Sequence, residues 1–212
     1  MTKKLKIDIV SDVVCPWCTI GYKHLEKAIK ELGVEDKVEI EWQPFELNPY
    51  MPMEGQDLEE HINEKYGATT QQQEASRQNM IDVGAKVGFK FDYFKGMRMV
   101  NTFDAHVLLE YAKKFNKQTE LKMRLTTAFF SERKDVSKIN ILEQALLDVG
   151  LNAKEGLATL ENEEARNAIK GKKEYWQKMG VNSVPTIVFN KTDGVTGAQP
   201  IDTFKNILNE FI

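Results

Sequence analysis

The 212-residue chain contains only two cysteines, and Cys15 and Cys18 stand three positions apart. Residues 5–10 largely alternate apolar and polar side chains, which predicts a strand leading directly into this pair. Apolar residues then recur at helical spacing across residues 16–32, and Gly33 is a typical helix end. Two cysteines cannot form a framework of structural disulfides, so packed strands and helices must supply the fold.

Strand and helix patterns recur at both ends of the chain. A second strand is expected over residues 38–43, ending at Pro44, so the N-terminal end predicts a β-α-β unit. The C-terminal end predicts a β-β-α unit, made of a strand over 186–189, a turn at Asp193–Gly194, a return strand over 195–197 and a helix over 201–211.

The middle of the chain is predicted to be helical. Helices are expected over residues 57–66, 71–87, 105–112, 139–149 and 161–179. Ser137 is the expected N-cap of the helix over 139–149, and Gly150 is its expected end. We therefore predict an α/β fold in which residues 1–50 and 180–212 form the core, while residues 51–179 form an α-helical insertion domain and a return helix.

Charge and hydropathy restrict the class of protein. The formal net charge is -3, the pI is near 5.8 and charges are mixed along the chain, which argues against a nucleic-acid or membrane-surface binder. Residues 1–8 lack the apolar run of a secretory signal, and no stretch approaches the ~20 apolar residues of a spanning helix. We therefore expect a cytoplasmic location.

The spacing of the two cysteines suits thiol–disulfide exchange, which needs one thiolate that attacks and a second thiol that resolves the mixed disulfide. Cys15 is expected at the helix N-terminus, where unpaired N–H groups and the helix dipole favour an anion. Cys18 is expected one turn inside the helix and more covered. We predict that Cys15 is the nucleophile and Cys18 the resolving thiol, and Pro16 suits the first helical turn.

The cysteine motif raises two further questions, whether it binds a metal and what Trp17 does. A Cys-x-x-Cys pair can be half of a zinc site, but no second cysteine pair exists and His24, His61 and His106 do not repeat at ligand spacing, so no metal is predicted. Trp17 either screens the site and contacts a partner or only covers the helix end.

After the cysteine pair, Pro185 is a second candidate site residue, and it directly precedes the predicted strand over 186–189. Proline can open a strand but cannot lie inside a central one. On the residues alone the Val184–Pro185 bond is expected to be trans, because only about 5–6% of X–Pro bonds in folded proteins are cis.

The order of these features resembles the DsbA-like branch of the thioredoxin superfamily, and the resemblance covers nearly the whole chain. Three segments are more narrowly similar to the FrnE-type proteins: Asp12–Gly21 (DVVCPWCTIG), Asn101–His106 (NTFDAH) and Thr196–Pro200 (TGAQP). The resemblance implies a thioredoxin-like fold with a large α-helical insertion that caps the site and forms one wall of a substrate groove.

The resemblance also implies roles for individual residues. Cys15 and Cys18 would be the redox pair, Pro185 would be a cis-proline facing it, and the backbone of Val184 would pair with an extended substrate. Together with Pro16 and Trp17 next to the pair, Val184 and Pro185 are the expected substrate-binding residues.

Two further features have alternative interpretations. His106 either faces the groove and supports the Cys15 thiolate or is a hydrogen-bonded structural histidine. A segment rich in aromatic residues and methionine either lines an apolar surface near the cysteines or pins a long loop to the insertion. Its members are Phe89, Phe91, Tyr93, Phe94, Met97 and Met99.

The leading functional hypothesis is a thiol–disulfide oxidoreductase or isomerase acting on protein or peptide substrates. It would hold no tightly bound cofactor, with glutathione as a conceivable redox partner, and the sequence does not predict an oligomeric state. One alternative is a glutathione-dependent isomerase similar to the 2-hydroxychromene-2-carboxylate isomerases, which usually carry a serine where Cys15 stands. Another is a holdase that binds unfolded chains without redox chemistry.

Overall fold

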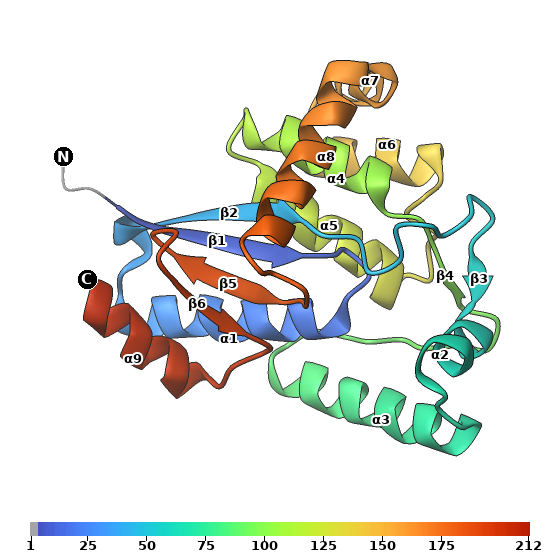
Figure 1. The fold of residues 1–212 in the computed structure, drawn as a ribbon, viewed down its shortest axis with the longest axis horizontal. Coiled ribbons are helices and arrows are strands. Elements are labelled where there is room, and N and C mark those ends of the chain that lie inside the picture. Colours follow the sequence, from blue (N-terminus) through green and yellow to red (C-terminus); the bar gives the residue numbers. More distant parts are fainter. Residues whose placement is uncertain (1–3) are drawn as a thin grey trace.

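A computed structural model describes residues 4–212 and contains a four-stranded sheet in the order β2-β1-β5-β6 (Figure 1). The strands are β1 (Leu5–Ser11), β2 (Val38–Pro44), β5 (Thr186–Phe189) and β6 (Asp193–Thr196). β1 is parallel to β2 and antiparallel to β5, which is antiparallel to β6. The two ends of the chain thus form one sheet, although residues 1–3 of the predicted core lie outside the described residues.

Helices cover both faces of this sheet (Figure 1). α1 (Pro16–Leu32) and α9 (Ile201–Phe211) pack on one face, because Ile7 and Ile9 of β1 point toward them. α8 (Glu163–Lys178) packs on the other face through Trp176, which contacts Val10. The alternation of β1 therefore places successive side chains on opposite faces.

The segment between the sheet halves is mainly helical. Its elements are β3 (Gln56–Asp57), α2 (Leu58–Tyr66), α3 (Thr70–Lys86), β4 (Arg98–Met99), α4 (Phe103–Lys113), α5 (Gln118–Ser131), α6 (Ile139–Asp148) and α7 (Ala153–Ala158), with a short 3-10 turn at Thr159–Glu161. A second 3-10 turn, Glu35–Lys37, lies between α1 and β2. Val13 and Val14, which precede Cys15, pack into the apolar core of this segment. The helical segment therefore reaches the cysteine pair. None of the helices among residues 4–212 is long and apolar enough to cross a membrane.

Two predictions about helices differ from the structure. The sequence patterns do not predict α5 or α7. Ser137 is not the N-cap of α6, because Lys138 occupies that position and the Ser137 side chain donates instead to the Asp135 carboxylate. A serine beside an aspartate thus forms a local loop contact in place of a cap.

The predicted turn at Asp193–Gly194 is wrong. Those two residues begin β6, and the chain reverses at Asn190 and Lys191, which both have positive φ angles of 48° and 63°. Two consecutive residues with positive φ are typical of the tight hairpin turn that matches strand twist, and asparagine tolerates this conformation better than most residues.

Helix α5 is attached to β2, which is an edge strand of the sheet. The Gln118 amide accepts a hydrogen bond from the Trp42 backbone N–H at 2.9 Å and donates to the Trp42 carbonyl at 3.0 Å. The Trp42 indole N–H also donates to the Thr119 hydroxyl at 2.9 Å. Because one side chain satisfies both outward backbone groups of Trp42, α5 has a defined register against the sheet.

A buried carboxylate joins the sheet to the helices that cover it. Glu41 on β2 pairs with Lys113 at 2.5 Å, with Lys6 at 2.7 Å and with Lys172 at 3.5 Å. Burial by itself would raise the pKa of Glu41, but these three lysines lower it to about 2. The carboxylate therefore favours the folded state when it is charged.

This pairing predicts a defined loss of stability in acid. The charged Glu41 carboxylate contributes its full stabilisation when the pH is above the ordinary glutamate pKa of 4.5. This contribution disappears as the pH falls toward 2, because the carboxylate is then protonated in the folded protein. At pH 7 it amounts to roughly 3 kcal/mol. Denaturant unfolding of wild type and Glu41→Gln should give a stability difference that is largest at neutral pH and shrinks between pH 4.5 and 2. A difference independent of pH would contradict this assignment.

Candidate active site

The first cysteine caps the helix that follows β1. Cys15 is the N-cap residue of α1, with φ -97° and ψ 111°, and Pro16 lies in the first turn. The Cys15 sulfur accepts a hydrogen bond from the Cys18 backbone N–H at 3.3 Å. β1 ends at Ser11, so the strand-to-helix junction itself positions the thiol where helix N–H groups stabilise an anion.

The second cysteine is enclosed. Cys18 is 1% exposed and Cys15 is 4% exposed, so the difference in exposure between them is smaller than the sequence suggested. Burial, together with the hydrogen bond to Cys15 and the charge of its sulfur, raises the pKa of Cys18 well above its ordinary value. A thiolate at Cys18 therefore needs a nearby positive charge to form readily.

The loop before β5 lies against the cysteine pair. The Val184–Pro185 peptide bond is cis, and the Val184 carbonyl oxygen lies 4.0 Å from the Cys15 sulfur. Pro185 also faces α1, because a Cβ atom added to Gly21 would lie 3.2 Å from the Pro185 ring. Glycine at position 21 thus lets the helix approach this loop closely.

A buried group of ionisable residues lies near the cysteines. Asp12 accepts hydrogen bonds from the backbone N–H groups of Val13 at 2.7 Å and of Leu47 at 2.8 Å. Burial alone would raise the pKa of Asp12, but the contacts with His106 and Leu47 and the charge of Lys122 hold it below its usual value. Asp12 is therefore a buried carboxylate rather than a neutral acid.

His106 lies on α4 and contacts the loop that leads to the cysteines. Its Nε2 atom is 2.9 Å from the Phe45 carbonyl oxygen and 3.4 Å from the Asp12 carboxylate. A carbonyl oxygen only accepts, so Nε2 carries a proton. Support of the Cys15 thiolate by His106 stays a prediction, and the contacts indicate that it would act through Asp12.

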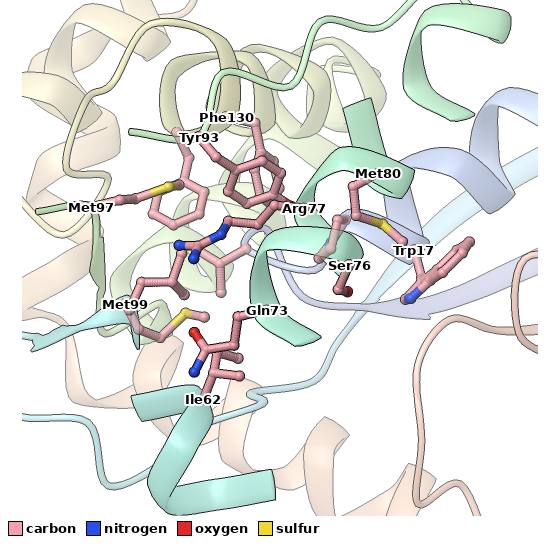
Figure 2. A pocket seen from close by; sticks show the side chains of 14 residues that line it. Trp17, Ile62, Gln73, Ser76, Arg77, Met80, Tyr93, Met97, Met99 and Phe130 are labelled. Carbon is pink, nitrogen blue, oxygen red and sulfur yellow. The ribbon is translucent and has the colours of Figure 1, made fainter. Parts of the chain in front are cut away.

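An apolar pocket of about 140 Å³ lies beside the first turn of α1 (Figure 2). Its lining residues come from the cysteine motif, from α2 and α3, from the 93–99 segment and from α5. They include Val14, Pro16, Trp17, Ile62, Met80, Tyr93, Met97, Met99 and Phe130. Figure 2 shows Arg77 of α3 among these side chains. Its guanidinium pairs with Glu59 at 3.2 Å. Trp17, which is 42% exposed, lines the pocket and also faces solvent.

The aromatic and methionine segment fits both of its predicted interpretations. Phe89 and Phe91 are buried and pack against Phe130, so they pin the loop to the insertion. Tyr93, Met97 and Met99 line the pocket instead. Burial and negative charge on the Cys15 sulfur raise the pKa of Tyr93.

Sequence reasoning missed Lys122 and Arg77. Lys122 lies on α5, a helix that the sequence patterns do not predict, and its side chain is 2% exposed. The available signal was a lysine between the apolar residues Leu121 and Leu125, a pattern that is also typical of an ordinary helix edge. Within residues 4–212, no group of three His, Cys, Asp or Glu side chains is arranged to hold a metal ion.

The fold and the cysteine pair at its strand-to-helix junction define a thioredoxin-like thiol oxidoreductase of the DsbA type. Residues 6–209 match the DSBA-like thioredoxin domain, and the chain belongs to this family. The predicted thioredoxin-like fold with an α-helical insertion is thereby confirmed.

Individual proteins that are similar to this chain are consistent with the family assignment. The chain is 29% identical over 205 residues to protein YwbO of Bacillus subtilis, covering 96% of each chain. It is similar to the crystal structure of a probable DsbA oxidoreductase from Streptomyces coelicolor, with a TM-score of 0.90, 28% identity, and coverage of 97% of this chain and 89% of that one. A 2-hydroxychromene-2-carboxylate isomerase shares the fold at a TM-score of 0.72 and 11% identity, with 97% and 95% of the two chains covered.

Proposed function

We propose that this protein exchanges disulfides with protein or peptide substrates through Cys15 and Cys18. The observation that carries the proposal is the position of the Cys15 sulfur, which lies at a helix N-terminus between the Cys18 N–H and the Val184 carbonyl and next to an apolar pocket. A thiolate there is stabilised by the helix and lies beside the Val184 backbone, with which an extended substrate chain would pair.

The reaction has two sulfur-transfer steps. The Cys15 thiolate attacks a substrate disulfide, forms a mixed disulfide and releases one substrate sulfur as a thiolate, which takes up a proton from solvent. Cys18 then loses its proton and attacks the Cys15 sulfur, which frees the second substrate thiol and leaves a Cys15–Cys18 disulfide. The substrate gains two electrons and the enzyme pair loses two. The reverse sequence oxidises a substrate dithiol.

The surroundings of Cys15 suit an extended substrate with apolar side chains. Val184 and Pro185 border one side of the sulfur, and Pro16 and Trp17 border the pocket on the other side. In this proposal the Val184 backbone pairs with the substrate strand while the pocket takes a side chain next to the substrate cysteine. The apolar lining favours segments that are exposed only in unfolded or partly folded proteins.

We also propose that the protein works in the cytoplasm, with no tightly bound cofactor and with glutathione as a source of electrons. A glutathione pool keeps dithiols of ordinary potential reduced, so the resting pair would be the dithiol. Because the resting enzyme would then carry a dithiol, it would reduce or isomerise the disulfides of its substrates.

Insulin reduction tests the proposal. Wild type should precipitate reduced insulin in the presence of a thiol reductant, and Cys15→Ser should fall to the rate of the reductant alone, because a hydroxyl cannot form the mixed disulfide. A Cys15→Ser variant as active as wild type would reject the assignment.

A second candidate is a glutathione-dependent isomerase acting on an aromatic carboxylate. The apolar pocket with Arg77 among its lining residues favours it, because a guanidinium binds carboxylates while apolar walls hold a ring. Glutathione-dependent isomerisation of 2-hydroxychromene-2-carboxylate that persists in Cys18→Ala would favour this candidate over disulfide exchange.

A further inference from the structure

Lys122 of α5 is a lysine buried in the protein interior. Its side chain lies inside the protein at 2% exposure, and among residues 4–212 its Nζ atom makes no hydrogen bond. The Trp42 ring lies near it, with its centroid 5.1 Å from Nζ. Burying an ammonium without a hydrogen-bonded partner is costly, so a lysine at this point requires an explanation.

The structure holds this lysine in a fixed place. Gln118 and Thr119 attach the start of α5 to Trp42 on β2 through three hydrogen bonds. Lys122 follows Gln118 by four residues, so both side chains lie on the same face of α5. The attachment of α5 therefore directs Lys122 over the Trp42 ring, and that ring packs against Tyr22 of α1 with the centroids 4.9 Å apart.

Every ionisable group that acts on Lys122 belongs to the site. Burial lowers the pKa of Lys122, and negative charge on Cys18, Asp12 and Cys15 opposes that effect, with Cys18 the strongest of the three. In return, Lys122 lowers the pKa of Cys18, which burial raises. His106 on α4 contacts Asp12, one of these three groups.

We propose that Lys122 is the internal counter-charge for Cys18 in the resolving step, an inference that rests on the proposed exchange reaction. A lone thiolate at Cys18 would be an uncompensated buried anion, whereas a thiolate that forms beside the Lys122 ammonium is compensated. Lys122 stays protonated throughout, and Cys18 releases its proton to solvent. The Cys18 sulfur then bonds to the Cys15 sulfur, the Cys15–substrate bond breaks, and the departing thiolate takes up a proton from solvent. Lys122 is thus a positioning residue for charge and forms no bond to substrate.

The thiolate titration of Cys18 tests this role without any substrate. In a Cys15→Ser background, absorbance at 240 nm reports the ionisation of Cys18 once the contribution of the six tyrosines is subtracted with the cysteine-free Cys15→Ser/Cys18→Ser protein. Adding Lys122→Met, which keeps the length of the side chain and removes its charge, should move the Cys18 midpoint upward by about one unit or more. Lys117→Met, at an exposed position just before α5, is the matched control and should leave the midpoint in place.

A kinetic measurement separates the two half-reactions. With Cys18 present, Lys122→Met should slow release of the mixed disulfide at pH 7 by roughly tenfold and recover at higher pH, since one pKa unit changes the thiolate fraction tenfold. The rate at which iodoacetamide alkylates Cys15 should change less than the rate of release. If wild type turns over no disulfide substrate, the proposed exchange reaction is rejected, whereas the titration of Cys18 still tests the effect of Lys122.

A purely structural lysine gives a different outcome. Replacing an unpartnered buried ammonium with methionine should then raise the free energy of unfolding while the Cys18 midpoint stays where it was. That result would overturn the proposal, because the midpoint is the property that a counter-charge must change.

Discussion

Replacing Cys18 with serine is expected to convert the protein into a covalent trap for its substrates. The Cys15 thiolate still attacks a substrate disulfide, but a serine hydroxyl cannot displace the substrate from the mixed disulfide. Turnover should therefore fall by at least ~100-fold while the adduct accumulates. The hydrogen bond to the Cys15 sulfur comes from the backbone N–H of residue 18, so it survives the substitution.

Intact-mass spectrometry after mixing with a peptide that contains one disulfide measures this outcome. The Cys18→Ser protein should gain the mass of the peptide and lose it again on treatment with dithiothreitol. Cys15→Ser is the matched control and should form little adduct, because Cys18 is enclosed and its pKa is raised by burial. Equal adducts from both variants would reverse the assignment of nucleophile and resolving thiol.

Gly84→Ala is expected to destabilise the protein by about 3 kcal/mol through overpacking. A Cβ atom at this position would lie 2.4 Å from the Phe91 ring and 2.8 Å from the Phe89 carbonyl oxygen. Helix propensity alone would favour alanine by about 1 kcal/mol, so the clash decides the sign. The change would push α3 away from the loop whose Tyr93 and Met97 line the pocket.

Gly171→Ala provides the control for this substitution. Gly171 lies within α8, and nothing lies within 4 Å of the Cβ atom that alanine would add. This variant should gain up to ~1 kcal/mol, in line with helix propensity. Urea unfolding of both variants gives the comparison, and a shift of the same sign and size in both would show that propensity rather than packing governs position 84.

The parts of the fold that depend on local sequence were predictable. The alternation across residues 5–10 and the helical spacing after Pro16 locate the junction that carries Cys15, and the structure places that residue at the helix N-cap. The cis bond at Pro185 was expected only from the resemblance, since the residues alone favour trans. The periodicity of apolar residues indicates helices and strands, but it does not indicate whether the peptide bond before a proline is cis or trans.

The buried charges were not predictable because they depend on contacts between distant segments. Asp12 and Lys122 are 110 positions apart in the chain, yet each affects the pKa of the other. Nothing in the pattern around Lys122 shows that its helix docks on Trp42, since that docking depends on the side chain of Gln118. A lysine is predicted to face solvent until the partner element is known.

The attachment of Gln118 to Trp42 also protects the protein from self-association. An open sheet margin offers unused donors and acceptors to any extended polypeptide. With both outward groups of Trp42 already bonded, a foreign strand would have to displace the Gln118 amide before it could pair there. The bonded margin of β2 therefore resists edge-to-edge pairing with another chain.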